Sequence, residues 1–372
     1  MKILYATTVG ITMGFFKQFV KSLLDAGHTV EIATNDAEVP IPECYREWGC
    51  VAHTISTSRS PLNKGNLGAV KQLRKLVEEN RYDIVHCHTP VAAMCARLAC
   101  RGARKRGTKV FYTAHGFHFY KGAPLKNWLL YYPVEKICSR WTDLLITINQ
   151  EDYALAQRKM KAKEVVYVPG VGVDLTKFGN ATVDRAAKRR ELGVPEDATL
   201  LLSVGELNAN KNHETIIRAL AKLENNANVY YAIAGRGGLD KYLQNLTASL
   251  GLGDRVKLLG YRTDVAELCA TADVFAFPSF REGLGLAAVE AMVYGLPLIT
   301  SNVHGINDYS EDGKTGFKNA PNDVDGFAES IKKLSEMKPE LREEISRYNR
   351  VLAQKYGLDK IIPTMKKLYG LD

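Results

Sequence analysis

Residues 273–301 read DVFAFPSFREGLGLAAVEAMVYGLPLITS and predict one strand–helix–strand unit. The apolar run 273–278 is typical of a buried strand, and a helix follows it that ends at Gly295, just ahead of Pro297. A second apolar run covers residues 297–301. Runs that are apolar on both faces indicate parallel strands covered by helices on each side.

The same alternation continues along the chain in two separate series. In the second half, further strands are predicted at residues 199–205, 229–235 and 255–260. In the first half the predicted strands are 2–7, 29–34, 83–89, 109–115, 143–149 and 165–169, with helices over 15–26 and 67–79. The stretch 170–195 between the two series shows no strong periodicity. We therefore expect two doubly wound, Rossmann-like α/β domains with parallel sheets rather than one long sheet.

The predicted domains cover residues 1–170 and 196–350, and a linker over 171–195 joins them. Two helices, over 342–356 and 358–371, follow the second series and are separated by Gly357. Periodicity leaves open whether the last helix packs on the second domain or crosses back to the first.

Composition excludes several classes of protein. The chain has 372 residues, of which 46% are hydrophobic and 24% charged, as in globular proteins of two domains. Its longest apolar runs fall short of the roughly 18 residues that a membrane span needs. Residues 1–6 look like a first strand rather than a signal peptide, and seven cysteines without a Cys-x-x-Cys pair argue against a disulfide framework. We expect a cytoplasmic protein.

The net charge of +9 is concentrated in the first half of the chain. Residues 1–170 hold 24 Lys and Arg against 14 Asp and Glu, whereas residues 171–372 hold 26 against 27. This asymmetry favours an anionic partner, which can be a nucleic acid, an acidic membrane surface or a phosphorylated substrate. Solubility alone is the alternative explanation.

The candidate sites are the loops that follow strands, because ligands of open α/β sheets bind outside the carboxyl ends of the strands. In the first domain, Gly10 and Gly14 either let backbone N–H groups approach a phosphate or form a plain tight turn. His115 ends another strand and can contact a substrate hydroxyl or be structural. A zinc site at His86-Cys87-His88 is disfavoured, because no further ligands follow at metal spacing.

Three loops of the second domain fit a nucleotide, although each can also be an ordinary solvated turn. Gly205 ends a strand, and Lys211 precedes the next helix, whose dipole adds to the attraction of the lysine for a diphosphate. The other two loops contain Gly235 and Arg236, and Gly260, Tyr261 and Arg262.

The strongest signal is a pair of acids in the quoted unit. Glu282 precedes a helix start that is rich in glycine, where a carboxylate can simply cap the helix. Glu290 lies within the helix among Ala287, Ala288 and Val289, where an unpaired acid is costly unless a ligand or a donor meets it.

With this pair, the sequence resembles the retaining glycosyltransferases of the two-domain GT-B fold, and most closely glycosyltransferase family 4. Glu282 and Glu290 match the E-x₇-E motif of that family, and the resemblance extends over essentially the whole chain. Residues 114–120 and 204–207 are most similar to bacterial capsule and exopolysaccharide enzymes, which act on lipid-linked glycans. The resemblance implies two Rossmann-like domains facing a cleft, with residues 351–372 packed back on the first domain.

The resemblance also implies roles for the matching residues. Glu290 would hold the donor ribose, Glu282 the sugar hydroxyls and Lys211 the diphosphate, while His115 would contact the donor sugar. Residues around Tyr261 and Arg262 would receive the base. The remaining donor-site positions would be Gly10, Gly14, Gly205, Gly235, Arg236, Gly283, Leu284, Gly285 and Leu286.

One position departs from the family pattern. Glu206 stands where many members carry an arginine that partners the lysine on the diphosphate, and an acid would repel a pyrophosphate at close range. Candidate substitutes are Arg236, Arg262 and Arg281. Because no Asp-x-Asp ends a predicted strand, we expect no metal or other cofactor, and we expect Lys211 and helix N-termini to stabilise the leaving group. Retention of the anomeric configuration without an obvious catalytic nucleophile favours a substitution in which the acceptor attacks the same face of the sugar from which the diphosphate departs.

The basic first half of the chain suggests where the acceptor substrate comes from. One cluster comprises Arg101, Arg104, Lys105, Arg106 and Lys109, and the stretch 121–136 alternates lysines with Leu, Trp and Tyr as interfacial helices do. We expect peripheral docking on the inner face of the cell membrane and a polyprenyl-diphosphate-linked saccharide as acceptor. The alternative is a helix that packs on its own domain.

The predicted reaction is transfer of a hexose or N-acetylhexosamine from a nucleotide-sugar, with UDP favoured by the resemblance over GDP and ADP. A UDP-sugar 2-epimerase of the same layout is the alternative. A Rossmann oxidoreductase is weakened by the missing Gly-x-Gly-x-x-Gly, and a nucleic-acid-binding protein by the absence of any recognisable motif.

Overall fold

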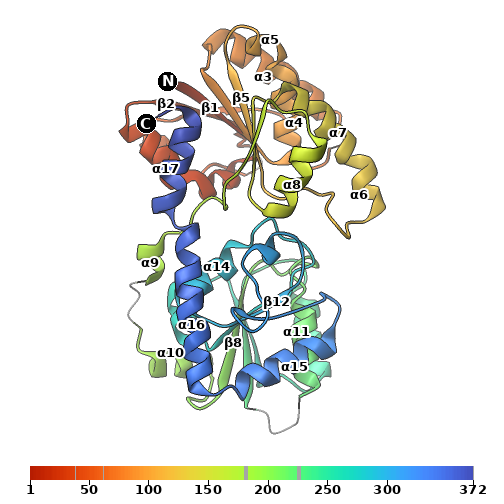
Figure 1. Cartoon of the computed structure of the whole chain (residues 1–372), viewed down its shortest axis with the longest axis vertical. Coiled ribbons are helices and arrows are strands. Elements are labelled where there is room, and N and C mark those ends of the chain that lie inside the picture. Colours follow the sequence, from red (N-terminus) through yellow and green to blue (C-terminus); the bar gives the residue numbers. More distant parts are fainter. Residues whose placement is uncertain (38, 62, 180–182, 224–227, 372) are drawn as a thin grey trace. The chain divides into compact units, whose positions relative to one another are not determined.

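The computed structural model describes every residue except 38, 62, 180–182, 224–227 and 372. The described chain divides into two units, residues 1–171 with 361–372 and residues 172–360. Each unit is built on one parallel sheet, as Figure 1 shows. The prediction of two doubly wound α/β domains is confirmed.

The first unit contains a seven-stranded sheet in the order β3-β2-β1-β4-β5-β6-β7. Its strands are β1 (Lys2–Val9), β2 (Thr29–Asn35), β3 (Val51–Thr54), β4 (Ile84–His88), β5 (Lys109–Ala114), β6 (Leu144–Thr147) and β7 (Glu164–Tyr167). Its helices are η1 (Gly10–Phe16), α1 (Lys17–Asp25), α2 (Cys44–Glu47), α3 (Gly65–Asn80), α4 (Pro90–Ala99), α5 (Arg101–Arg104), α6 (Leu125–Leu130), α7 (Tyr132–Cys138), η2 (Ser139–Trp141) and α8 (Gln150–Lys159).

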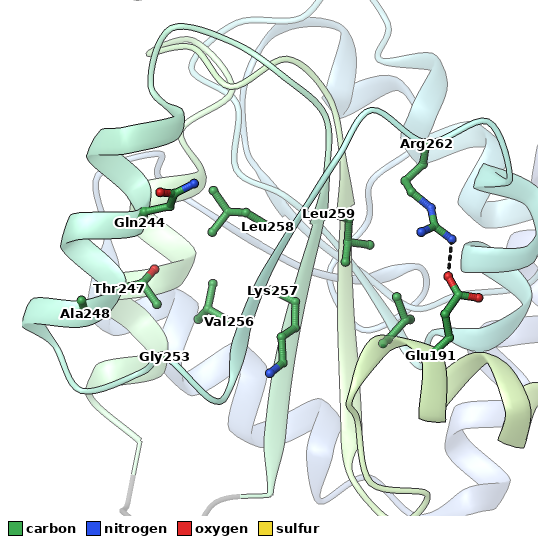
Figure 2. Close-up of a pocket in the computed structure, with 11 residues that line it drawn as sticks. Glu191, Gln244, Thr247, Ala248, Gly253, Val256, Lys257, Leu258, Leu259 and Arg262 are labelled. Atoms are coloured by element: carbon green, nitrogen blue, oxygen red, sulfur yellow. Dashed lines mark hydrogen bonds and ion pairs between the residues drawn. The ribbon is translucent and has the colours of Figure 1, made fainter.

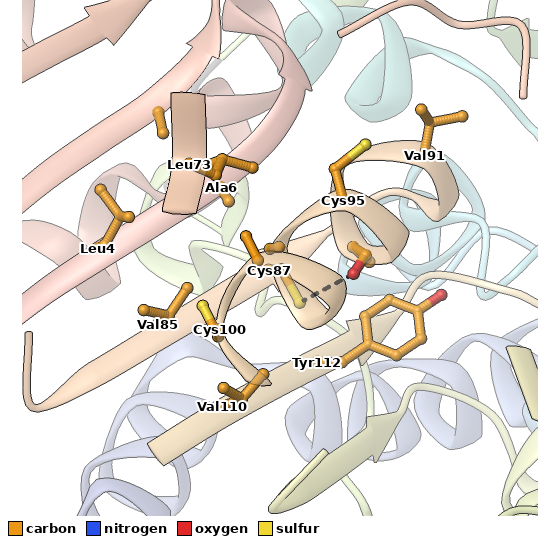
Figure 3. Packing of buried hydrophobic residues seen from close by; sticks show 14 of the residues in the cluster. Leu4, Ala6, Leu73, Val85, Cys87, Val91, Cys95, Cys100, Val110 and Tyr112 are labelled. Carbon is orange, nitrogen blue, oxygen red and sulfur yellow. Dashed lines mark hydrogen bonds between the residues drawn. The ribbon is translucent and has the colours of Figure 1, made fainter. Parts of the chain in front are cut away.

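Two apolar layers cover this sheet. One joins the sheet to α3, α4 and α8, and Figure 3 shows Leu73, Cys95 and Val91 of this layer above the strand residues Val85 and Val110. The other layer contains α1 and the C-terminal helix α17 (Leu358–Tyr369), whose apolar side chains from residue 361 onward belong to the core of the first unit. The last helix therefore packs on the first sheet from residue 361 onward, whereas residues 351–360, which were also expected there, belong to the second unit.

The second unit contains a six-stranded sheet in the order β10-β9-β8-β11-β12-β13. Its strands are β8 (Thr199–Val204), β9 (Val229–Ala234), β10 (Val256–Gly260), β11 (Val274–Phe277), β12 (Leu298–Ser301) and β13 (Gly316–Asn319). Its helices are α9 (Leu175–Gly179), α10 (Arg185–Leu192), α11 (His213–Ala221), α12 (Asp240–Ser249), α13 (Val265–Thr271), α14 (Leu286–Val293), η3 (His304–Asp308), α15 (Val324–Ser335), α16 (Pro339–Ala353) and η4 (Gln354–Tyr356).

The structure adds elements that the periodicity did not predict. Strands β3 and β13 lie at sheet edges, are four residues long and are only partly buried, so they lack a continuous apolar run. The predicted linker stretch 171–195 contains the helices α9 and α10, and almost all of it belongs to the second unit. Asp184 caps α10 by accepting a hydrogen bond from the Ala187 N–H.

Candidate functional site

The strand order of the second unit puts its candidate loops beside a topological switch point. From β8 the sheet continues through β9 and β10 on one side, and through β11, β12 and β13 on the other. The loops after β8 and β11 therefore leave the same sheet edge on opposite sides of this switch point, which is where open α/β sheets bind their ligands. These are the loops that carry Lys211 and Glu282.

Lys211 and Glu282 meet at this point. The Lys211 Nζ lies 2.7 Å from Oε1 of Glu282, and both side chains are largely buried, with 21% and 13% of their surface exposed. The ammonium group also lies 4.9 Å from the centre of the Phe277 ring. A cation and a carboxylate are thus held together at the switch point, where a diphosphate and sugar hydroxyls can compete for them.

Close packing of the loops requires glycine at position 235 and leaves little room for a side chain at Gly205. A Cβ on Gly235 would lie 1.8 Å from the carbonyl oxygen of Gly205, and one on Gly205 would touch the aliphatic stem of Lys211 at 3.3 Å. The Leu207 N–H donates to the Arg236 carbonyl oxygen at 3.0 Å, which ties the same two loops together. The loops after β8 and β9 are thus packed closely together beside the stem of Lys211.

The loop between β11 and α14 also has a defined geometry. Gly285 has φ +86°, and a Cβ there would lie 2.4 Å from the Phe277 ring, so only glycine fits. Leu284 is buried and Leu286 begins α14. The amides of the first turn of α14 lie at the end of the helix that attracts anions.

Glu290 lies in the second turn of α14 and is separate from the Lys211–Glu282 pair. Burial raises the pKa of its carboxyl group to about 7, although the charge of Lys177 on α9 lowers it somewhat. A carboxyl group in this setting gains from hydrogen-bond donors that favour its charged form. Sequence reasoning missed Lys177, because it lies in the stretch that was predicted as a linker.

The side chain of Arg262 is bound within its own unit. Its guanidinium group contacts Glu191 at 2.6 Å and Asp264 at 2.5 Å. Figure 2 shows this pair at one end of a groove of about 450 Å³ along the edge strand β10, with Lys257 on the strand. Two carboxylates thus hold the Arg262 side chain within its own unit.

Glu206, which stands at the position of the missing arginine, is exposed. The candidate replacements for that arginine lie in different places. Arg236 is also exposed and lies 6.0 Å from the ring centre of Tyr261, so these two site residues are neighbours. Next to Glu282, the carbonyl oxygen of Arg281 accepts a hydrogen bond from Asn210.

The first unit has its own switch point, between β1 and β4, and a pocket of about 600 Å³ lies there. Its walls come from the loops after both strands and are mainly apolar, including Ile11, Phe15 and Val91. Three polar or aromatic side chains from other loops complete the lining: Arg59, His118 and Tyr131. The sequence analysis missed Arg59, and it named the segments of His118 and Tyr131 without predicting that they share a pocket, because the three residues lie far apart in the chain.

Gly10 and Gly14 have different places in this region. Gly10 is buried, its N–H donates to the carbonyl oxygen of Val39 at 2.9 Å, and a Cβ would lie 2.4 Å from the same atom. The amide of Gly10 is therefore used by the protein itself. Gly14 is exposed and lines the pocket, so it remains available to a ligand.

His115 is held by a second histidine. Its Nε2 lies 3.0 Å from Nδ1 of His88 at the end of β4. Burial lowers the pKa of His115 to about 4, so its ring is neutral at pH 7. The neighbouring His86 contacts Tyr369 of α17 at 2.5 Å and Thr113 at 2.8 Å. No group of three or more His, Cys, Asp or Glu in the described residues could hold a metal ion.

The basic and aromatic segments of the first unit lie apart. Helix α5, with part of the basic cluster, precedes β5 and so lies at the amino edge of the sheet, whereas the loop before α6 leaves the carboxyl edge (Figure 1). Arg104 is paired with Asp143 at 2.7 Å. Helix α6 has no buried residue, and Leu125 and Leu129 are 73% and 70% exposed.

The aromatic side chains of the same segment face inward. Trp128, Tyr131 and Tyr132 pack against the core of the first unit. The ring of Tyr131 stacks on His118 with centres 4.4 Å apart. The segment is thus anchored on one side and exposes leucines and lysines on the other. None of the helices in the described part of the chain is long and apolar enough to cross a membrane.

Comparison with known proteins identifies the family. Residues 15–177 match the family model described as Glycosyltransferase Family 4, and residues 184–352 match the one described as Glycosyl transferases group 1. A Bacillus subtilis protein named glycosyltransferase EpsD is 38% identical over 99% of this chain and 96% of its own length. The chain belongs to glycosyltransferase family 4. The enzyme resembles a second relative, the Escherichia coli UDP-Gal:alpha-D-GlcNAc-diphosphoundecaprenol alpha-1,3-galactosyltransferase, with 31% identity over 73% of each chain.

Solved structures show that the glycosyltransferase has the GT-B fold. Anabaena Alr3699/HepE, crystallised with UDP, aligns with a TM-score of 0.82 at 22% identity over 100% of both chains. WaaG, described as a glycosyltransferase involved in lipopolysaccharide biosynthesis, aligns with a TM-score of 0.77 at 20% identity over 99% of both chains. The prediction of a family 4 glycosyltransferase is confirmed, and the epimerase alternative is not favoured.

Proposed function

We propose that this glycosyltransferase moves a hexose or an N-acetylhexosamine from a UDP-sugar to a polyprenyl-diphosphate-linked saccharide, with retention of configuration, in capsule or exopolysaccharide synthesis. The observation that carries the proposal is the Lys211–Glu282 pair at the switch point of the second unit, next to the N-terminus of α14. The names of the relatives support the substrate classes, because one acts on a diphosphoundecaprenol-linked sugar with UDP-Gal as donor.

The donor would bind to the second unit. Lys211 and the first amides of α14 would bind the diphosphate, Glu282 the sugar hydroxyls, and Glu290 the ribose hydroxyls. Arg236 and Tyr261 lie together on the neighbouring loops, where they would contact the nucleotide. His115 remains our proposed contact to the donor sugar, as a neutral ring that can donate or accept one hydrogen bond.

The proposed chemistry needs positive charge where the leaving group forms. The bond between the sugar and the diphosphate breaks, the acceptor oxygen forms its bond to the same face, and the acceptor proton passes to the departing phosphate. Lys211 and the dipole of α14 would stabilise the negative charge without a metal. Two acids of an Asp-x-Asp sequence, Asp323 and Asp325, are engaged elsewhere: one caps α15 and the other pairs with Lys222.

The acceptor would bind in the 600 Å³ pocket of the first unit. Its apolar walls suit the faces of a sugar and the start of a polyprenyl chain, and Arg59 adds a positive charge for a diphosphate.

The proposal is tested by incubating the enzyme with labelled UDP-sugars and undecaprenyl-diphosphate-linked saccharides. We expect a longer lipid-linked saccharide whose new linkage has the anomeric configuration of the donor, and we expect the rate to persist in EDTA. Release of a free epimerised sugar without a lipid product would contradict transfer, and an inverted linkage would contradict retention.

We also propose that α6 docks on the anionic inner leaflet of the cell membrane, which holds the enzyme peripherally where its acceptor is embedded. The exposed Leu125 and Leu129 would enter the interface, while Lys121 and Lys126 would face the lipid headgroups. Tyr131, at the end of α6, lines the acceptor pocket, so docking would bring the lipid headgroup near it.

Replacing both Leu125 and Leu129 with serine should lower binding to vesicles rich in anionic phospholipid about tenfold or more, since two apolar side chains lose their burial. Sedimentation with vesicles at low salt measures the bound fraction. Leu67→Ser is the matched control, because Leu67 is also 70% exposed but lies on α3. Equal losses in both variants, or no binding by the unaltered protein, would refute docking through α6.

A further inference from the structure

The Lys211–Glu282 pair requires a change of partners when a donor binds. In the structure each side chain neutralises the other at 2.7 Å. A diphosphate that takes Lys211 leaves the Glu282 carboxylate, 13% exposed, without its cation. A carboxylate that is mostly buried is costly to leave without a hydrogen-bond donor.

A suitable hydrogen-bond donor for Glu282 lies next to the same loop. Tyr309 follows η3, is fully buried, and its hydroxyl group has no hydrogen-bond partner among the described residues. The Tyr309 Oη would lie 3.1 Å from a Cβ on Gly285, so it points at the turn between Glu282 and α14. Gly305 of η3 donates its N–H to the carbonyl oxygen of Glu282 at 3.2 Å, which ties the two segments together.

Packing explains the ring of Tyr309 but not its hydroxyl group. The ring meets that of Tyr356 edge-on, with centres 6.3 Å apart. A phenylalanine would make the same ring contact without burying an unpaired hydroxyl group. Burial raises the pKa of Tyr309, and the charge of Glu282 adds to this rise.

We propose that Tyr309 is a positioning residue. Its hydroxyl group donates a hydrogen bond to the Glu282 carboxylate when Lys211 no longer contacts that carboxylate. The role in the reaction rests on the proposed function, since the donor diphosphate is the group that withdraws Lys211. With Tyr309 as its new partner, Glu282 stays in place to receive the sugar hydroxyls.

Removing Lys211 by mutation tests this change of partners without any ligand. In the unaltered background, Tyr309→Phe should leave the thermal midpoint of the ligand-free protein unchanged or slightly higher, because an unpaired hydroxyl group is lost. In the Lys211→Met background the same substitution should lower the midpoint by roughly 4–8 °C, because Glu282 then loses its replacement donor. Equal effects of Tyr309→Phe in the two backgrounds would overturn the proposal, as would a large loss in the unaltered one.

Tyr294→Phe is the matched control. Tyr294, just after α14, also has a buried hydroxyl group without a partner among the described residues. Tyr294→Phe should change the thermal midpoint equally in the unaltered and the Lys211→Met backgrounds. If the two changes differ as much as they do for Tyr309→Phe, the effect of Tyr309→Phe is not specific.

Kinetics separate the positioning role from the proposed function. Tyr309→Phe should lower kcat about tenfold at saturating UDP-glucose, and an unchanged kcat would contradict a role in the reaction. If the unaltered protein neither binds nor uses a nucleotide-sugar, the proposed function fails, whereas the ligand-free mutant cycle still decides whether Tyr309 replaces Lys211.

Discussion

Replacing Lys211 with methionine should lower kcat/KM for sugar transfer about 100- to 1000-fold, which is the cost of removing one preorganised group that stabilises charge in a transition state. Methionine keeps an apolar stem over Gly205 and near Phe277, so the loop can keep its packing. The loss comes from the ammonium group, which would otherwise balance the charge that develops on the leaving diphosphate. Initial rates over a range of donor concentrations give kcat and KM separately.

Lys222→Met is the control for this experiment. Lys222 lies in the same unit, just after α11, and pairs with Asp325 at the surface, away from the candidate site. Its substitution should leave kcat/KM within about twofold, since exposed ion pairs contribute little. A loss below about fivefold in Lys211→Met would remove this lysine from the reaction.

Glu290→Gln should raise the Kd for UDP-glucose about 10- to 100-fold at pH 8, because a charged acceptor of two ribose hydroxyl groups is replaced by a neutral amide. Isothermal titration calorimetry measures this change directly. Glutamine has nearly the same volume, so α14 should keep its packing. An unchanged Kd would refute the ribose assignment.

The same residue should make donor binding depend on pH. The pKa of Glu290 is about 7 in the ligand-free protein, because burial disfavours the charged form. Ribose hydroxyl groups favour the carboxylate, so binding below pH 7 requires loss of a proton, and the Kd for UDP-glucose should rise about tenfold from pH 8 to pH 6. The Glu290→Gln variant should lack this dependence between pH 6 and 8. A parallel pH profile in both proteins would show that another group titrates.

The raised pKa also predicts the sign of a change in stability. A carboxyl group whose folded pKa exceeds its unfolded value stabilises the protein below the unfolded pKa of about 4.5, and this contribution is lost as the pH rises through 7. Glu290→Gln should abolish this loss of stability between pH 4.5 and 7, because glutamine does not titrate. A bound nucleotide whose ribose pairs with the carboxylate would offset this loss of stability.

Much of the fold follows from local pattern. The strands that form the centre of each sheet, such as β4 and β11, are buried along their length and mostly apolar, because both of their faces are covered by helices, and these strands were predicted correctly. The edge strands β3 and β13 were missed, since partial burial lets polar residues such as His53 and Lys318 occupy them. The helices α9 and α10 were missed because the stretch around them lacks a clear periodicity.

The candidate site was predictable only in part. Glycines and acids at strand ends mark the loops, because the carboxyl edge of a parallel sheet is where such loops gather. The uses of individual groups were not predictable: the amide of Gly10 is taken by Val39, and Arg262 is held by Glu191 and Asp264. A sequence shows which groups can bind a ligand, but not which of them the protein already occupies.

The sequence by itself determined two parallel α/β sheets, the loops that bear glycine, lysine and glutamate, and the family to which the chain belongs, because these depend on residue type and spacing along the chain. Only the tertiary structure decided that Lys211 meets Glu282, that His88 holds His115, and that Tyr369 reaches His86. These pairs join segments that are 27 to 283 residues apart. Their meeting depends on the order in which strands pack side by side, and that order is set by burial over each whole sheet rather than by any local pattern.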